Sequence, residues 1–273
     1  MSACQGHPRA SRREAATAFL TALLLAVVLG SPARAEPLDP EVGRMLERAL
    51  ADAENFRKQL PTLEYDAKMR VQEWDARGRL RGTAKAVAIM RPGDPKPMTF
   101  ISREIEGKVR LPEESSSSKD DDDENKTTLQ EFSAKHQMPE RFDFQVVGTD
   151  SIAGQPARRV TFKPKPDPPK KRNTADRFLG VVEGTAWVSE ADNKLVKFDM
   201  KLQQPFRLLW IIAVLRELSI NYELVERGDI IGKAKLKVLF SLRTPVYSIR
   251  QLHDVEMSNF RPRKSVAAVA DQL

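Results

Sequence analysis

The chain has 273 residues, a formal net charge of +7 and one cysteine, Cys4. Because Cys4 precedes an apolar run near the N-terminus, the exported chain expected below has no disulfide, thiolate metal site or cysteine nucleophile. The small excess of positive charge suits an anionic surface such as phospholipid or lipopolysaccharide, but it is not typical of a nucleic-acid-binding protein. The length fits one sizeable β-rich domain, with two small domains as the alternative.

Residues 1–35 have the organisation of a secretory signal peptide. Three arginines precede an apolar run at 15–29, and an Ala-Arg-Ala cleavage signal ends at Ala35. The alternative is an anchor that is not cleaved, but the run is shorter than the roughly 20 residues that a membrane helix needs. We therefore expect a mature chain that starts at Glu36 and is exported to the periplasm.

The first predicted element of the mature chain is a helix at about 40–60. Asp39 is a good N-cap, and Pro40 is favoured at the first helical position. Apolar residues follow at helical spacing and form one stripe, and Pro61 ends the helix. Such a stripe must pack on another part of the protein.

The pattern then changes to a period of two, which indicates strands. Ala67, Met69 and Val71 alternate with charged or polar residues, and the turn at 75–78 leads into a returning strand at 80–90. These two segments predict a β-hairpin. A further strand is expected at 97–104.

The segment at 113–126 (EESSSSKDDDDENK) is acidic and of low complexity. It has too few apolar residues to form a packed structure, so we expect a disordered surface loop. Calcium binding by Asp120–Glu124 is an alternative, although the run has neither the glycine nor the ligand spacing of a calcium loop.

Two strands are expected next, at 142–147 and 157–163. The segment that follows, at 164–172 (PKPDPPKKR), is rich in proline and basic residues. We interpret it as a stiff loop that either is a solvated linker or contacts phosphate headgroups.

The clearest strand signals lie in the second half of the chain. Segments at 184–189, 196–202, 218–224, 234–242 and 247–260 are predicted strands, and most of them have one apolar and one charged face. The predicted fold is therefore mainly β with helices (α+β). We expect a curved antiparallel sheet that forms a half-closed β-barrel, with helices plugging its concave apolar face.

The segment at 205–217 (PFRLLWIIAVL and two further residues) is the most apolar part of the mature chain. Leu208, Ile211, Ile212 and Leu215 have helical spacing, so the segment predicts a second, short helix. A helix that is apolar on nearly every side must be buried or must meet an apolar ligand.

The order of elements resembles a known superfamily. The resemblance rests mainly on FDFQVVGTDSIAGQPARRVTFKPK and GTAWVSEADNKLVKFDMKL, together with the leader, the first helix and the last strands. These features resemble the LolA/LolB-like outer-membrane lipoprotein-sorting superfamily, which includes RseB/MucB-like periplasmic proteins. The resemblance implies a LolA-like domain at 36–262, a C-terminal tail at 263–273, and an apolar cavity for acyl chains.

The sequence has no catalytic motif and no clustered metal ligands, so we expect no catalytic residues, no metal, no cofactor and no enzyme activity. Carboxylates such as Asp66 and Glu73 are interpreted as solvated. The candidate site is instead a hydrophobic cavity that combines the apolar segment with inward-facing strand residues. Its predicted lining is Phe206, Leu209, Trp210, Ile212, Val214, Phe198, Met200, Trp187, Phe240 and Met69.

Two functions follow from this interpretation. The first is a periplasmic carrier or binder of a lipid, an acylated protein or another amphiphile, with the segment at 205–217 as a gate. The second is an RseB-like regulatory module that binds a protein of the envelope and transports no ligand. Contact with a membrane surface is compatible with both, and no nucleic-acid partner is expected.

Overall fold

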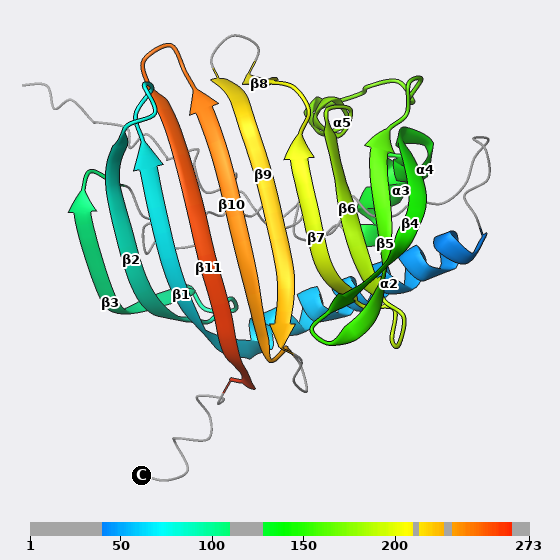
Figure 1. The fold of residues 1–273 in the computed structure, drawn as a ribbon, viewed down its shortest axis with the longest axis horizontal. Coiled ribbons are helices and arrows are strands. Elements are labelled where there is room, and N and C mark those ends of the chain that lie inside the picture. Colours follow the sequence, from blue (N-terminus) through cyan, green and yellow to red (C-terminus); the bar gives the residue numbers. More distant parts are fainter. Residues whose placement is uncertain (1–39, 110–127, 210–212, 227–230, 264–273) are drawn as a thin grey trace, which may run out of the picture.

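The computed structural model describes residues 40–109, 128–209, 213–226 and 231–263. The predicted signal peptide, the acidic segment at 113–126 and most of the C-terminal tail lie outside these residues. The described chain is a strongly curved antiparallel sheet with helices on one side (Figure 1). This architecture confirms the predicted fold class.

The strands follow the order β3-β2-β1-β11-β10-β9-β7-β6-β5-β4, and a short strand, β8, pairs with β9. The two ends of this order, β3 and β4, do not pair with each other, so the barrel is half open. The strands are β1 (Leu63–Trp74), β2 (Leu80–Met90), β3 (Met98–Gly107), β4 (Phe142–Ile152), β5 (Gln155–Pro164), β6 (Val182–Ser189), β7 (Leu195–Leu202), β8 (Phe206–Leu209), β9 (Ala213–Glu226), β10 (Lys233–Arg243) and β11 (Ser248–Pro262).

The long helix α2 (Pro40–Gln59) confirms the first predicted element. Its apolar stripe is buried, and a 3-10 turn, η1 (Leu60–Thr62), connects it to β1. Three short helices join it on the same side of the sheet: α3 (Leu129–Lys135), α4 (Met138–Arg141) and α5 (Thr174–Leu179). In Figure 1 these helices lie beside β4–β7, and α2 crosses behind the lower ends of the strands.

The main core lies between these helices and the sheet. Leu46 and Leu50 of α2 pack in one cluster with Phe162, Phe198 and Ile220 of the strands. Phe162 and Phe198 stack with ring centroids 5.7 Å apart. The helix-facing side of the sheet is called the inner face below.

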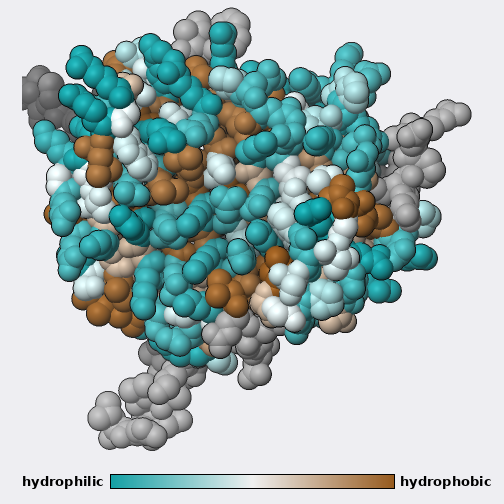
Figure 2. Space-filling view, in the orientation of Figure 1, coloured by the Kyte–Doolittle hydropathy of each residue, from teal (hydrophilic) through white to brown (hydrophobic). Residues whose placement is uncertain are grey.

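The outer face of the sheet carries many charged residues because the strands alternate over most of their length. Lys237 pairs with Asp254 at 3.4 Å, and Lys233 pairs with Glu256 at 3.0 Å. Figure 2, which has the orientation of Figure 1, shows hydrophilic residues spread widely over the side of the molecule turned to the viewer.

The prediction of a helix at 205–217 is wrong for its described residues. Phe206 pairs with Leu215 and Arg207 with Val214, so the segment forms the hairpin of β8 with the start of β9. Its aromatic and β-branched residues favour extended backbone, and pairing with a neighbouring strand satisfies the backbone groups of β8. The predicted plug at this place is therefore a strand, and the covering helices are α2 to α5.

Candidate functional site

The inner face changes character along the width of the sheet. Near the helices its side chains are almost completely buried, and Phe162, Phe198 and Ile220 are each at most 1% exposed. On β10, β11 and β1 the same face remains apolar, but many of its side chains are only partly buried. We call this second part the open inner wall. It consists of Met69, Leu236, Val238, Phe240, Val255 and Met257.

Strand pairing brings the open inner wall together from distant parts of the sequence. Val255 lies opposite both Met69 of β1 and Leu236 of β10. Met257 lies two residues further along β11 on the same face, opposite Ala234. Directly opposed residues of an antiparallel pair share a face, so these side chains form one apolar strip three strands wide.

Small side chains extend this strip onto β2. Ala84, Ala86 and Ala88 share its face, and Ala86 lies directly opposite Met69. Under the helices the corresponding face is built of phenylalanine, as at Phe162. These three alanines are 0%, 5% and 0% exposed, so β2 contributes small, buried side chains beside the partly buried strip.

A row of polar side chains ends the open inner wall near the turn between β1 and β2. The amide of Gln251 donates to Glu73 Oε2 at 2.8 Å, and His253 Nε2 lies 3.0 Å from Gln251 Oε1. Since an amide oxygen only accepts, Nε2 of the neutral imidazole is the donor. Glu73 and Gln251 are each 4% exposed, so a carboxylate is buried on an otherwise apolar face.

The environment of this polar row is apolar. The ring of His253 stacks on Phe240 with centroids 5.7 Å apart, and burial lowers the pKa of His253. On the same face, burial raises the pKa of Tyr65 to about 12 and, together with the charge of Asp52, that of Tyr222 to about 12. The inner face thus combines a low-polarity surface with a few fixed hydrogen-bonding groups.

The structure places some of the predicted lining residues on the inner face. Met69 and Phe240 belong to the open inner wall. Phe198 and Met200 have the same orientation but lie in the filled core, where each is at most 1% exposed. Of these four residues, Met69 and Phe240 are partly exposed, and Phe240 also packs against the main core cluster.

The predicted lining residues of the apolar segment are spread differently. Phe206 is 4% exposed and packs edge-on against Phe178 of α5, with centroids 5.3 Å apart. Val214 is partly buried and lies opposite Arg207 and Arg243. Leu209 ends β8. Trp210 and Ile212 lie outside the described residues.

Trp187 lies on the outer face, away from the predicted cavity. It is directly opposite Lys197, whose Nζ lies 4.8 Å from the centre of the indole ring. Its Nε1 donates to Asp150 Oδ2 at 2.7 Å. Trp187 therefore packs among charged side chains of the outer face, and it does not line the predicted cavity.

The polar row was not predicted from the sequence, and Glu73 was interpreted as solvated. A signal was present, however, because Glu73 continues the alternation of Ala67, Met69 and Val71. Gln251 and His253 likewise alternate in step with Val255. Strict alternation assigns all three polar residues to the inner face.

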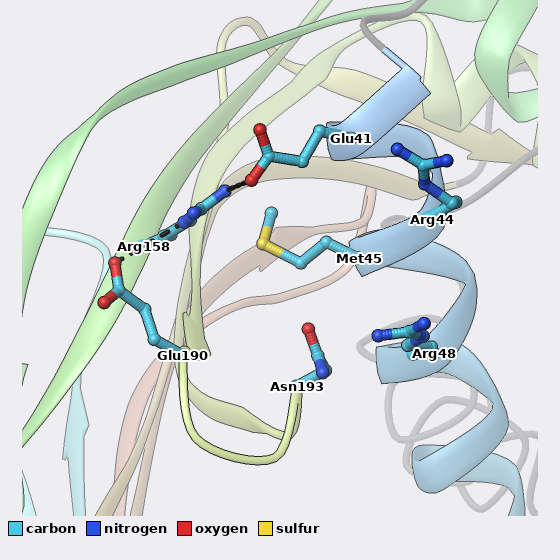
Figure 3. A pocket seen from close by; sticks show the side chains of 7 residues that line it. All are labelled: Glu41, Arg44, Met45, Arg48, Arg158, Glu190 and Asn193. Carbon is cyan, nitrogen blue, oxygen red and sulfur yellow. Dashed lines mark hydrogen bonds and ion pairs between the residues drawn. The ribbon is translucent and has the colours of Figure 1, made fainter.

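A separate small pocket of about 160 Å³ lies where α2 meets the turn between β6 and β7. Figure 3 shows Met45 pointing into it and Arg158 placed between Glu41 and Glu190. Arg158 forms ion pairs with both carboxylates, and the hydrogen bond to Glu41 raises its pKa. This arrangement fastens the start of α2 to β5, so we interpret it as a clamp.

Among the described residues, no group of three or more histidine, aspartate or glutamate side chains is arranged to hold a metal ion. No helix in these parts of the chain is both long enough and apolar enough to span a bilayer.

The fold and the site define a half-open antiparallel β-barrel with a helix-filled half and an open apolar half. No family model and no curated protein matches the sequence. The chain has a weak similarity to several solved structures.

A DUF1329 family protein from Desulfovibrio piger has 11% identity over 80% of this chain and 95% of its own, with a TM-score of 0.29. A putative outer membrane lipoprotein-sorting protein domain from Vibrio parahaemolyticus has 10% identity over 81% of this chain and 94% of its own, with a TM-score of 0.28. A LolA superfamily protein from Nitrosomonas europaea has 10% identity over 83% of this chain and 98% of its own, with a TM-score of 0.25.

Proposed function

We propose that this chain is a periplasmic, non-enzymatic carrier or binder of an amphiphile such as a lipid or an acylated protein. The apolar part of the ligand lies against the open inner wall, and its polar part lies at Glu73, Gln251 and His253. The observation that supports this most is the partly exposed apolar strip that continues a fully packed core on the same face of one sheet. The periplasmic location rests on the predicted signal peptide.

Burial of an acyl chain against this wall supplies the binding energy. Each buried methylene contributes about 0.8 kcal/mol, so a chain of moderate length binds without any catalytic or metal chemistry. The polar row limits which amphiphiles fit, because its buried groups must stay hydrogen-bonded when the ligand is in place.

The test is binding of a fluorescent acyl probe, a dansyl-labelled fatty acid, to the purified mature protein. Val255→Asp places a charge on the open inner wall, and we expect it to weaken probe binding at least about tenfold. Leu252→Asp is the matched control, because Leu252 lies on the same strand but on the outer face. We expect the control to bind as the wild type does.

Native mass spectrometry of protein purified without detergent provides an independent measurement. We expect co-purified acyl lipids in the wild type and their loss in the Val255→Asp variant. A wild-type protein that carries no lipid and also refuses the probe would refute the proposed function.

One observation favours the second candidate function, a protein-binding module of the envelope. Both edge strands carry exposed apolar side chains: Val146 and Val147 on β4 are each 42% exposed, and Ile101 on β3 is 63% exposed. An exposed strand edge can accept a strand from a partner. Loss of a captured envelope protein in a Val147→Lys variant that still binds the acyl probe would support this function.

A further inference from the structure

Exposed basic side chains surround the short helix α5. Lys170, Lys171 and Arg172 precede it, Arg177 lies on it, and Arg207 lies on the neighbouring strand β8. Arg177 Nη2 lies 3.5 Å from the carbonyl oxygen of Arg207, which connects the two elements. We call these five residues the basic end; α5 lies at the upper edge of the molecule in Figure 1.

Within the described residues, the side chains of the basic end have no ion pair with a carboxylate. The nearby Asp176 is buried and binds His136 and Arg141, and Glu183 pairs with Lys201 at 3.1 Å. Asp167 is the one exposed acid in the proline-rich loop. The basic end therefore keeps a local excess of positive charge.

A buried charge network fixes the backbone that carries these cations. Arg141, which is 2% exposed, donates to the carbonyl oxygens of Pro169 at 3.1 Å and Lys170 at 3.2 Å. Asp176 accepts from the backbone N–H of Arg172 at 2.8 Å.

The same network joins the helices. His136 Nδ1 donates to Asp176 Oδ1 at 2.6 Å, and Arg141 Nη2 lies 3.2 Å from Asp176 Oδ2. Burial raises the pKa of Asp176, but the hydrogen bonds from His136 and Arg172 and the charge of Arg141 outweigh it and lower the pKa. A buried ion pair adds little net stability over an apolar packing, so its consequence here is the fixed position of the loop.

From these observations we infer that the basic end docks the protein on an anionic phospholipid bilayer. Several exposed cations on a fixed backbone, which outnumber the one exposed acid of the loop, match a layer of phosphate groups, and juxtaposed lysines and arginines add their attractions to such a surface. The sequence of the loop has prolines between its charges and no aromatic residue, so it lacks the stacking groups that single-stranded nucleic acid requires. This inference does not depend on the open inner wall.

The test is co-sedimentation of the mature protein with vesicles. One set contains phosphatidylglycerol and phosphatidylcholine in equal parts, and the other contains phosphatidylcholine alone. We expect binding to the anionic vesicles only. We also expect high salt to abolish it, because the screening length falls from about 8 Å at physiological ionic strength to about 3 Å at 1 M.

The variant Lys170→Glu/Lys171→Glu should weaken binding to the anionic vesicles at least about tenfold, in line with the contribution of each basic residue at such a surface. The control Lys96→Glu/Lys108→Glu makes the same change of net charge at exposed positions beside β3, the strand at one end of the strand order. It should bind nearly as the wild type does. Arg177→Gln/Arg207→Gln provides a second variant, and thermal unfolding of each variant checks that the fold is retained.

Three results would overturn the inference. The wild type could fail to bind anionic vesicles, it could bind neutral vesicles equally well, or the two lysine variants could lose binding to the same extent. Lipopolysaccharide added as a competitor distinguishes the sources of phosphate: if it alone binds the basic end while the vesicles do not, the phospholipid proposal fails. The acyl probe should bind the Lys170→Glu/Lys171→Glu variant normally, so failure here is distinct from failure of the proposed function.

Discussion

The two halves of the inner face share one alternating pattern but differ in what covers them. Beneath α2 to α5, phenylalanines such as Phe162 and Phe198 fill the space and are at most 1% exposed. On β1, β10 and β11 many of the inward side chains are partly exposed, and those of β2 are mainly buried alanine. Alternation thus determines which face is apolar, whereas side-chain volume and the helices determine which part becomes core.

The largest expected effect is a difference between the same truncation in the two halves. Phe198→Ala removes a ring from the filled core and should reduce the free energy of unfolding by about 3–5 kcal/mol. Phe240→Ala should cost clearly less, because its side chain is already partly exposed and the space that it leaves stays connected to solvent. Urea unfolding of both variants measures the difference. Equal losses would mean that both halves belong to one core.

Enlarging a side chain should also distinguish the two halves of the inner face, because added volume is costly in a filled core and tolerated on an open wall. Ala186 is 1% exposed and lies between Phe198 and Val160, so Ala186→Leu should overpack the core and cost about 1–3 kcal/mol. Val255→Leu adds one methylene on the open inner wall, where we expect a change within about 0.5 kcal/mol, as at surface sites. Thermal unfolding of the two variants decides the point. A loss at Val255→Leu as large as that at Ala186→Leu would show that the wall is already filled.

The polar row gives a prediction of intermediate size. Glu73→Leu leaves the amide of Gln251 without this partner, and the pair should show a coupling energy of about 1–2 kcal/mol in a cycle with Gln251→Leu. Because both residues have further contacts, only the cycle isolates their mutual hydrogen bond. Denaturant unfolding of the four proteins measures the coupling. A coupling energy near zero would show that Glu73 and Gln251 do not act as a structural unit, and it would weaken the proposal that the polar row takes part in binding.

The sequence predicted the long elements of the fold well. The helix expected at 40–60 is α2 (Pro40–Gln59), and the expected hairpin is β1 and β2. These elements have a long, regular apolar period, which is the most reliable local signal. The described residues form eleven strands, and ten of them match predicted strands; the short β8 lies in the segment for which a helix was predicted.

Other features could not be predicted because they depend on tertiary pairing. Helix α5 has six residues, too few to show a helical period. Leu208 and Leu215 have helical spacing, yet their segment pairs as a hairpin. Trp187 lies in a strand with apolar residues on both faces, so alternation did not assign it a side. Glu73 and Gln251 are 178 positions apart, and only the register of β1 with β11 brings them together.

The smallest expected effect is a pH dependence that originates in the open half. Burial lowers the pKa of His253 below its ordinary value of 6.5, so the unfolded chain takes up this proton more readily than the folded protein. Stability linked to His253 is therefore complete above about pH 6.5 and is lost as the pH falls from there toward the lowered value.

The groups that face His253 explain why it stays neutral. Gln251 binds its Nε2, Phe240 stacks on its ring, and Val71 and Val238 lie opposite it on the two neighbouring strands. The nearest carboxylate of the row, Glu73, contacts Gln251 and Arg81. Protonation would thus place a charge on an apolar face without a direct counter-ion among these groups.

His253→Gln should make the free energy of unfolding less dependent on pH between about 7.5 and 5.5 than it is in the wild type. Carboxylates whose pKa is lowered, such as Asp176 and Glu54, lose their contribution only below their ordinary values of 3.8 and 4.5, so they add little in this window. Chemical unfolding at several pH values gives the two slopes. Identical slopes would show that His253 is not held neutral by its surroundings, and the open half would then be wetter than its side chains indicate.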